Sequence, residues 1–187
     1  IEIGCGEGHF IRGLAKQFNG RGKFVGFDPT DDDYIFFPCQ LPYDESIKYH
    51  SNYSEIEVVS ALVSWAKAHH VNVVFKAHPA NPKSCNEFQK IAYGKYMYWS
   101  DASIHDLINH AKAVYTINSG VGFEAMFYNK PIVTFGRIEY DAVTIHASLD
   151  NLSEVSIEAV PTKTGCFLSL LSLILSIIAL NFSFSVM

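Results

Sequence analysis

Apolar positions along the middle of the chain fall into short continuous runs that alternate with helical stripes. A short, unbroken apolar run is typical of a strand buried on both faces of a parallel sheet. The runs that predict strands span residues 34–38, 71–76, 113–118 and 131–135. Strands and helices that alternate in this way predict an α/β fold with a doubly wound, mostly parallel sheet over residues 34–160.

The helical stripes lie between these runs and begin at recognisable signals. Ser54-Glu-Ile-Glu57 has the pattern of a capping box, which marks the start of a helix. Ser103-Ile-His-Asp106 repeats that pattern before a second apolar stripe, and residues 121–128 predict a third helix. The stripe expected on the first helix contains Ile56, Val59, Leu62, Val63 and Ala66.

The first 30 residues follow a different pattern, in which two short strands flank a glycine turn and a helix at 10–18. This βαβ fragment resembles the opening motif of class I S-adenosylmethionine-dependent methyltransferases. The resemblance implies that Gly4, Gly6 and Gly8 lie against the methionine moiety and that Asp28 holds the ribose hydroxyls. It covers under a sixth of the chain, so we expect S-adenosylmethionine to bind only if the fragment belongs to a complete domain.

Residues 166–187 form an uncharged tail rich in leucine and isoleucine. About 20 apolar residues are enough to span a bilayer, whereas five serines and the lack of a flanking basic cluster speak against a span. Two interpretations stay open, a membrane anchor and a segment foreign to the domain. The expected location is the cytoplasm, at the inner face of the cytoplasmic membrane if the tail is an anchor.

Charge and cysteine content exclude several classes of function. The net charge is −5 and the 14 basic residues do not cluster, so nucleic acid is not an expected partner. The four cysteines at positions 5, 39, 85 and 166 form no C-x-x-C pair, which argues against a zinc site or a disulfide framework. The acids at 31–33 are consistent with a solvated linker, and no metal site is expected.

Two loops at predicted strand ends carry the chemistry. Ser119-Gly-Val-Gly122 turns a strand into a helix, which aims backbone N–H groups and a helix dipole at one point and suits a phosphate. Lys76-Ala-His78-Pro79 ends another strand. Because the carboxyl ends of parallel strands lie at one edge of a sheet, both loops would border one nucleotide site.

Four motifs in the region 34–145 together resemble the bacterial capsule-polysaccharide synthesis family. They are Gln40-x-x-x-Asp44, Lys76 to Pro79, Ser119 to Glu124, and Phe135-Gly136 with Tyr140. That family includes retaining β-Kdo glycosyltransferases, which use CMP-Kdo as donor. The resemblance implies one Rossmann-like half of a two-domain GT-B enzyme, which binds a CMP-sugar donor and a glycan or glycolipid acceptor.

The resemblance also assigns roles to these residues. Asp44 matches the catalytic nucleophile, and His78 is expected to stabilise the leaving CMP phosphate. The N–H groups of the Ser119 turn would hold the same phosphate, and Glu124 would accept hydrogen bonds from ribose hydroxyls. Sugar transfer of this kind requires no cofactor. The full set of expected substrate-binding residues is Gln40, Lys76, Pro79, Ser119, Gly120, Val121, Gly122, Glu124 and Tyr140.

Structural explanations compete with each assignment. A glycine turn between strand and helix often serves only to make the turn, His78 is also consistent with an ordinary loop histidine, and Asp44 with a helix cap. Two other functions therefore stay open beside sugar transfer to a capsule or lipopolysaccharide glycan. They are an S-adenosylmethionine-dependent methyltransferase and a non-catalytic module that binds a nucleotide or glycan.

Overall fold

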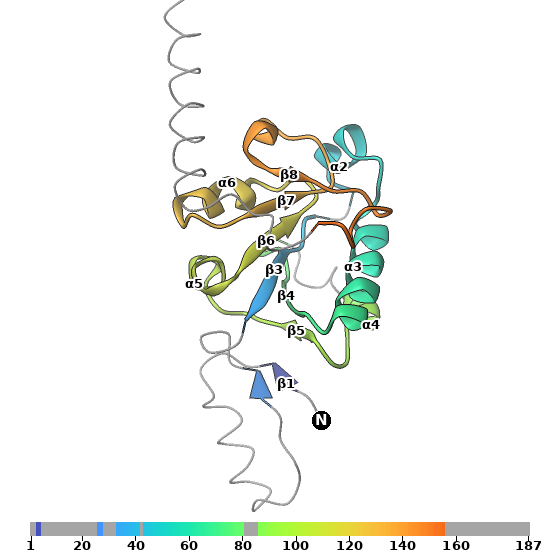
Figure 1. The fold of residues 1–187 in the computed structure, drawn as a ribbon, viewed down its shortest axis with the longest axis vertical. Helices are drawn as coiled ribbons and strands as arrows, with labels where there is room; N and C mark the ends of the chain where they lie inside the picture. The colour runs from blue at the N-terminus through green and yellow to red at the C-terminus, as the bar shows by residue number, and fades with distance from the viewer. Residues whose placement is uncertain (1–2, 5–25, 28–32, 42, 81–85, 156–187) are drawn as a thin grey trace, which may run out of the picture.

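The computed structural model describes residues 3–4, 26–27, 33–41, 43–80 and 86–155, and within them six parallel strands form one sheet (Figure 1). The strand order is β5-β4-β3-β6-β7-β8. The α/β fold with a parallel sheet is therefore confirmed. The strands are β3 (Tyr34–Pro38), β4 (Asn72–Lys76), β5 (Met97–Trp99), β6 (Ala113–Thr116), β7 (Ile132–Thr134) and β8 (Ile145–His146).

Strand β3 lies at the centre of the sheet, and its residue Phe36 pairs with Val74 on one side and Val114 on the other. All five residues of β3 are buried, as its unbroken apolar run predicts. After β3 the chain adds β4 and β5 on one side and then crosses back to add β6, β7 and β8 on the other. The winding direction reverses between β3 and β6, and ligands of open α/β sheets bind at such a point.

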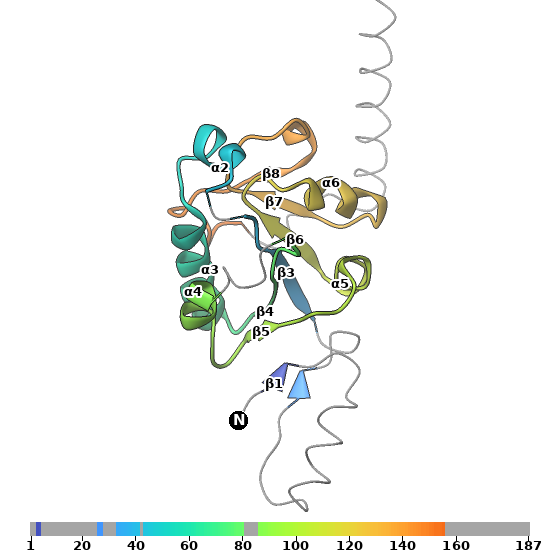
Figure 2. The ribbon, with the colours of Figure 1, turned by 180° about the vertical axis from the view of Figure 1, so that it is seen from behind.

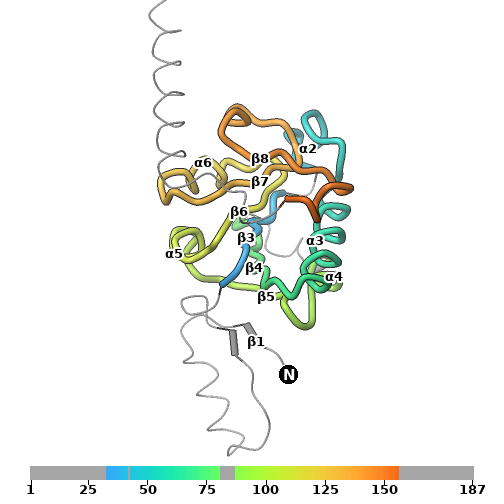
Figure 3. Tube along the Cα trace, viewed as in Figure 1, coloured from blue at the N-terminus to red at the C-terminus, as the bar shows by residue number. Residues whose placement is uncertain are grey.

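Helices cover both faces of the sheet and bury an apolar layer on each (Figures 1 and 2). On one face α3 and α4 pack over side chains such as Phe37 and Phe75; on the other α5 and α6 pack over Phe36 and Val114. The tube in Figure 3 shows the same alternation of strand and helix. The helices are α2 (Glu45–His50), α3 (Glu55–His69), α4 (Asn86–Ile91), α5 (Ile104–His110), α6 (Gly120–Phe127) and the 3-10 turn η1 (Asp141–Val143).

Helix α3 begins at the predicted capping box but turns a slightly different face to the core. The Ser54 N–H donates to Glu57 Oε2 at 2.8 Å, which confirms the box. Ile56 is 41% exposed, so its place in the buried stripe was wrong. Glu55 and Val58 are buried instead. Glu55 lies near the centre of the arc formed by the other buried positions, and Val58 lies on the side of that arc opposite Ile56. Glu55 is tolerated there since its Oε1 accepts the N–H of Gln40 at 2.7 Å.

The second capping signal is only partly confirmed. Ser103 is the residue before α5, as predicted, but its side chain makes no capping hydrogen bond. Its backbone carbonyl still accepts the N–H of Leu107 at 3.0 Å, so the helix starts there without the side-chain contact. Burial of Leu107 and Ile108 against the sheet holds α5 in place instead.

Near the N-terminus, β1 (Ile3–Gly4) pairs in parallel with β2 (Gly26–Phe27). This pairing agrees with the two strands predicted there. Gly6, Gly8 and Asp28 lie outside the described residues, as do the helix expected at 10–18 and the tail 166–187. Within the described ranges, no helix has the length and apolar character needed to cross a membrane.

Candidate functional site

The carboxyl ends of β3, β4 and β6 surround one cavity of about 330 Å³. Six of the residues singled out from sequence line it, on loops that are separated by some 40 positions in the chain. We call it the His78 cavity. These six residues are Lys76, His78, Pro79, Ser119, Val121 and Glu124, and Pro38, Cys39, Ala77 and Ile104 complete the lining.

The loop after β4 presents a cation and an imidazole to this cavity. Lys76 Nζ donates to the carbonyl oxygen of Ala102 at 2.8 Å, which holds the ammonium group near the cavity wall. His78 Nδ1 accepts the N–H of Ala80 at 3.2 Å. In that arrangement the ring proton of a neutral imidazole lies on Nε2, from which it can be donated to a bound oxygen.

The turn at Ser119 caps helix α6 and uses most of its own N–H groups. Ser119 Oγ accepts the N–H of Val121 at 3.2 Å, and the Ser119 carbonyl accepts the N–H of Gly122 at 3.0 Å. For the N–H of Gly120, no partner is found in the described part of the chain. The turn therefore offers an anion one backbone donor and the positive end of α6, rather than all of the N–H groups of the turn.

Gly122 and Tyr140 support the turn from behind. A Cβ atom on Gly122 would come within 2.9 Å of Tyr140 Cζ, so only glycine allows this approach. Tyr140 is 4% exposed, and its hydroxyl donates to the carbonyl oxygen of Ser119. Burial, followed by the charges of Glu139 and Asp141, raises the pKa of Tyr140 well above its usual range. Neither residue lines the His78 cavity, although both were expected to bind substrate.

Glu124 lies one turn into α6 and faces the His78 cavity. Its Oε2 is 4.0 Å from His105 Nδ1, and both side chains are well exposed. An exposed pair at this distance contributes little to stability and leaves the carboxylate able to accept other hydrogen bonds. Glu124 therefore lines the cavity, and its role in binding hydroxyls stays a prediction.

Gln40 has a structural position rather than a place in the cavity. It is 4% exposed, and its Nε2 donates to Asn118 Oδ1 at 3.0 Å. Asn118 in turn donates from Nδ2 to the carbonyl oxygen of Ser46 at 2.8 Å. These bonds tie the loop after β3 to the loop after β6. Sequence reasoning did not assign a role to Asn118, and the signal available was a polar amide two residues after the buried strand β6.

Asp44 caps helix α2 and does not line the His78 cavity. Its Oδ1 accepts the N–H of Ser46 at 2.9 Å. It borders a separate cavity of about 590 Å³ together with Tyr43, Lys48 and Tyr53. The structure thus brings His78, Ser119 and Glu124 together and places Asp44 at the same edge of the sheet, beside a neighbouring cavity.

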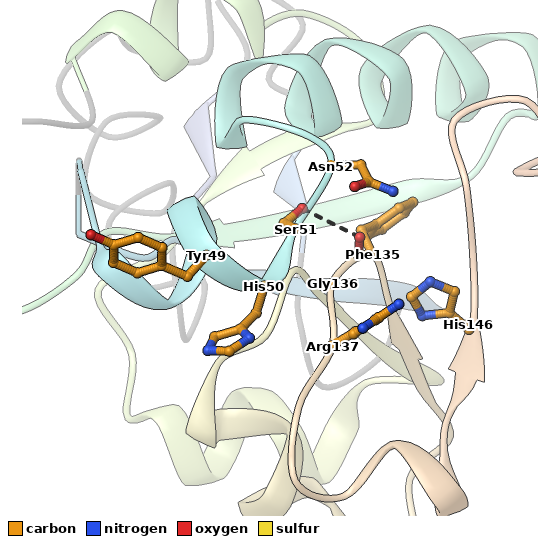
Figure 4. Close-up of a pocket in the computed structure, with 8 residues that line it drawn as sticks. All are labelled: Tyr49, His50, Ser51, Asn52, Phe135, Gly136, Arg137 and His146. Atoms are coloured by element: carbon orange, nitrogen blue, oxygen red, sulfur yellow. Dashed lines mark hydrogen bonds between the residues drawn. The ribbon is translucent and has the colours of Figure 1, made fainter.

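A third cavity at this edge was not anticipated from sequence (Figure 4). It has a volume of about 340 Å³ and lies where β7 and β8 end beside the C-terminus of α2. We call it the Arg137 pocket. The available signal was Arg137 itself, which directly follows the Phe135-Gly136 motif. The lining residues are Tyr49, His50, Ser51, Asn52, Phe135, Gly136, Arg137 and His146.

Comparison with known proteins settles the family. The sequence pattern of the family described as capsule polysaccharide biosynthesis protein matches residues 25–184, which is most of the chain. The chain belongs to this family. The match begins after the glycine turn at 4–8, so it gives no support to a methyltransferase as the function of the whole chain.

Two curated relatives each match part of this family member. It is 28% identical over 123 residues to the capsule polysaccharide export protein KpsS of Escherichia coli, which covers 59% of the chain and 32% of the relative. It is 28% identical over 138 residues to protein FixF of Sinorhizobium fredii (strain NBRC 101917 / NGR234), covering 69% and 33%. The chain therefore spans about a third of the length of these relatives.

Two solved structures share the fold of this chain. The β-Kdo 2,4 transferase of Thermosulfurimonas dismutans KpsC superposes with a TM-score of 0.52 at 16% identity, over 80% of this chain and 46% of that one. The β-Kdo 2,7 transferase of the same KpsC gives 0.50 at 24% identity, over 74% and 44%. This capsule biosynthesis family member thus has the fold of about half of each of those chains.

The expected absence of a metal stays a prediction for this family member. Among the residues that the structure describes, no three or more His, Cys, Asp or Glu side chains are grouped so as to hold an ion. The cavity instead offers donors and one carboxylate, which are groups that recognise phosphate and hydroxyl oxygens directly.

Proposed function

We propose that this chain is the nucleotide-binding half of a glycosyltransferase that transfers Kdo, or a related sugar, from a CMP-activated donor to a capsule or lipopolysaccharide glycan. The observation that carries the proposal is the convergence of Lys76, His78, Ser119 and Glu124 on one cavity at the switch point of the sheet. Membership of the capsule biosynthesis family supports the substrate class.

Each side of the cavity suits one part of a CMP group. The phosphate would accept hydrogen bonds from the Gly120 N–H and His78 Nε2, with the positive charge of Lys76 nearby. Glu124 would accept hydrogen bonds from the ribose hydroxyls. Charge stabilisation of this kind lowers the barrier to departure of a phosphate, because negative charge develops there as the bond to the sugar breaks.

Asp44 is our proposed nucleophile for the transfer step. One carboxylate oxygen would form a C–O bond to the anomeric carbon while the bond from that carbon to the CMP phosphate breaks, and the electron pair leaves with CMP. An acceptor hydroxyl would then displace Asp44, so that two inversions give retention. This step requires the sugar to extend from the His78 cavity toward α2, where Asp44 lies beside the neighbouring cavity.

Calorimetric titration of the 187-residue chain with CMP tests nucleotide binding. We expect His78→Ala and Glu124→Gln each to weaken CMP binding about tenfold, equivalent to about 1.4 kcal/mol. Gln89→Ala, on the exposed surface of α4, is the control and should bind CMP as the parent chain does. A rise in melting temperature with S-adenosylmethionine and none with CMP would contradict the proposal and favour a methyltransferase.

Two substitutions separate the chemical role of Asp44 from its role as a helix cap. Asparagine caps a helix as well as aspartate does, whereas alanine loses about 1 kcal/mol of stability. We therefore expect Asp44→Asn to remain as stable as the parent chain but to abolish the covalent sugar adduct seen by intact-mass spectrometry after incubation with CMP-Kdo. If the parent chain binds CMP and never forms an adduct, the non-catalytic binding module is the better description.

A further inference from the structure

The Arg137 pocket is separate from the His78 cavity, although both open at the carboxyl edge of the sheet. The two share no lining residue. The Arg137 pocket forms beyond β7 and β8, whereas the His78 cavity forms beyond β3, β4 and β6. A substrate that occupied the His78 cavity would therefore leave the Arg137 pocket open to a second chemical group.

Two chain segments build the walls of this pocket and are bonded to each other. The N–H of Arg137 donates to the carbonyl oxygen of His50 at 2.7 Å, and Ser51 pairs with Gly136 in an antiparallel bridge. A Cβ atom on Gly136 would lie 3.1 Å from the His50 oxygen and 3.1 Å from Ser51 Cβ. The missing side chain of Gly136 lets the segments meet, so the pocket is held in shape without a ligand.

The side chains around the pocket are cationic or neutral. Its lining contains one arginine, two histidines, a serine and an asparagine, with no acidic residue, in a chain of net charge −5. Arg137 is exposed and forms no ion pair with any residue of the described ranges. Figure 4 shows the Arg137 side chain and the His146 ring directed toward the same space, while the Tyr49 ring points away.

We propose that the Arg137 pocket binds an anionic oxygen group, a carboxylate or a phosphate, on a sugar substrate. A planar guanidinium presents paired N–H donors that match both groups, and imidazole and amide N–H groups add further donors. Two sources fit this chemistry, the carboxylate of an acidic donor sugar and a phosphate on a glycolipid acceptor. The assignment to a sugar substrate rests on the proposed function, whereas anion binding itself does not.

Titration of the 187-residue chain with free Kdo and, separately, with inorganic phosphate tests the proposal. We expect at least one probe to bind, Arg137→Gln to weaken that binding at least tenfold, and Arg137→Lys to weaken it less because the charge remains. CMP affinity should not change in either variant. Lys112→Gln is the matched control, since Lys112 precedes β6 at the opposite edge and pairs with Asp33 at 2.6 Å.

Each outcome decides a different point. Binding of Kdo alone assigns the pocket to the donor carboxylate, and binding of phosphate alone assigns it to a phosphorylated substrate. The proposal is overturned if neither probe binds at about 10 mM, or if Arg137→Gln, shown to be folded by its melting temperature, binds the probe as the parent chain does. If the parent chain binds an anion probe through Arg137 but does not bind CMP, only the proposed function is contradicted.

Discussion

Gln40 and Asn118 form a closed pair of hydrogen bonds at the switch point of the sheet. Gln40 Nε2 donates to Asn118 Oδ1 at 3.0 Å, and the Asn118 backbone N–H donates to Gln40 Oε1 at 3.1 Å. The pair is buried and joins residues 78 positions apart in the chain. Because Asp44 follows one partner and Ser119 the other, this pair sets the distance between the two loops on which the proposed chemistry depends.

Gln40→Ala is expected to lower the free energy of unfolding by about 1–3 kcal/mol, since it leaves the buried Asn118 N–H without a partner and removes one of two donors to Asn118 Oδ1. Gln89→Ala is the same substitution on the exposed surface of α4 and should change stability by no more than about 0.5 kcal/mol. Urea denaturation of both variants measures the difference. Equal stability of the two would mean that the Gln40–Asn118 pair does not hold the loops together.

The two glycines of the Ser119 turn should respond differently to alanine. Gly122→Ala places a methyl group against the Tyr140 ring and is expected to cost about 1–3 kcal/mol through overpacking. At Gly120 a Cβ atom has no neighbour within 4 Å, so Gly120→Ala should change stability by about 0.5 kcal/mol or less. Thermal unfolding of both variants checks this order, and a larger loss at Gly120 would contradict the described geometry.

Two buried tyrosines differ in whether their hydroxyl groups form a hydrogen bond, and they can be compared directly. The Tyr34 hydroxyl donates to the carbonyl oxygen of Leu107 at 2.7 Å, whereas the Tyr115 hydroxyl has no hydrogen-bond partner within the described ranges. Tyr34→Phe should therefore cost about 1 kcal/mol, and Tyr115→Phe should be neutral or stabilising. Urea midpoints measure both effects. A clear loss of stability in Tyr115→Phe would show that its hydroxyl is bonded in solution.

The free energy of unfolding should fall in alkaline solution because of three buried tyrosines, which are Tyr34, Tyr115 and Tyr140. Burial raises the pKa of Tyr115 to about 12, and it raises the pKa values of Tyr34 and Tyr140 as well. A phenol that must stay neutral when folded contributes fully below its ordinary pKa of about 10, and its contribution is lost as the pH rises from there through the folded value.

We therefore expect tyrosine ionisation to leave the urea midpoint unchanged up to about pH 9 and to lower it above pH 10. Tyrosine absorbance near 295 nm should show the three buried phenols ionising only with unfolding. Tyr115→Phe should decline less steeply than the parent chain, because it removes one of the three groups. A midpoint that does not fall between pH 9 and pH 11 would contradict this account.

Parts of the candidate site were predictable from local sequence. The motifs around His78, Ser119 and Glu124 follow buried strands, and a parallel sheet brings such strand ends to one edge, where these three residues line one cavity. Asp44, which was expected beside them, borders a different cavity. The inward position predicted for Ile56 was wrong, because a stripe read from spacing alone leaves its boundary uncertain by one residue. Glu55 is tolerated at the central position because a backbone donor from a distant loop bonds one of its carboxylate oxygens.

Periodicity and strand-end motifs were thus sufficient for the α/β class, the parallel sheet and the edge at which the polar residues gather, since these follow from short-range spacing and burial. Tertiary packing separated the residues that face a cavity from those that support it: Gln40 and Tyr140 turn inward to bond other loops, and Arg137 meets His50 and His146 from distant segments. Such pairings depend on which loops pack together at the edge of the sheet. A local sequence pattern does not determine this, because the paired residues are far apart in the chain.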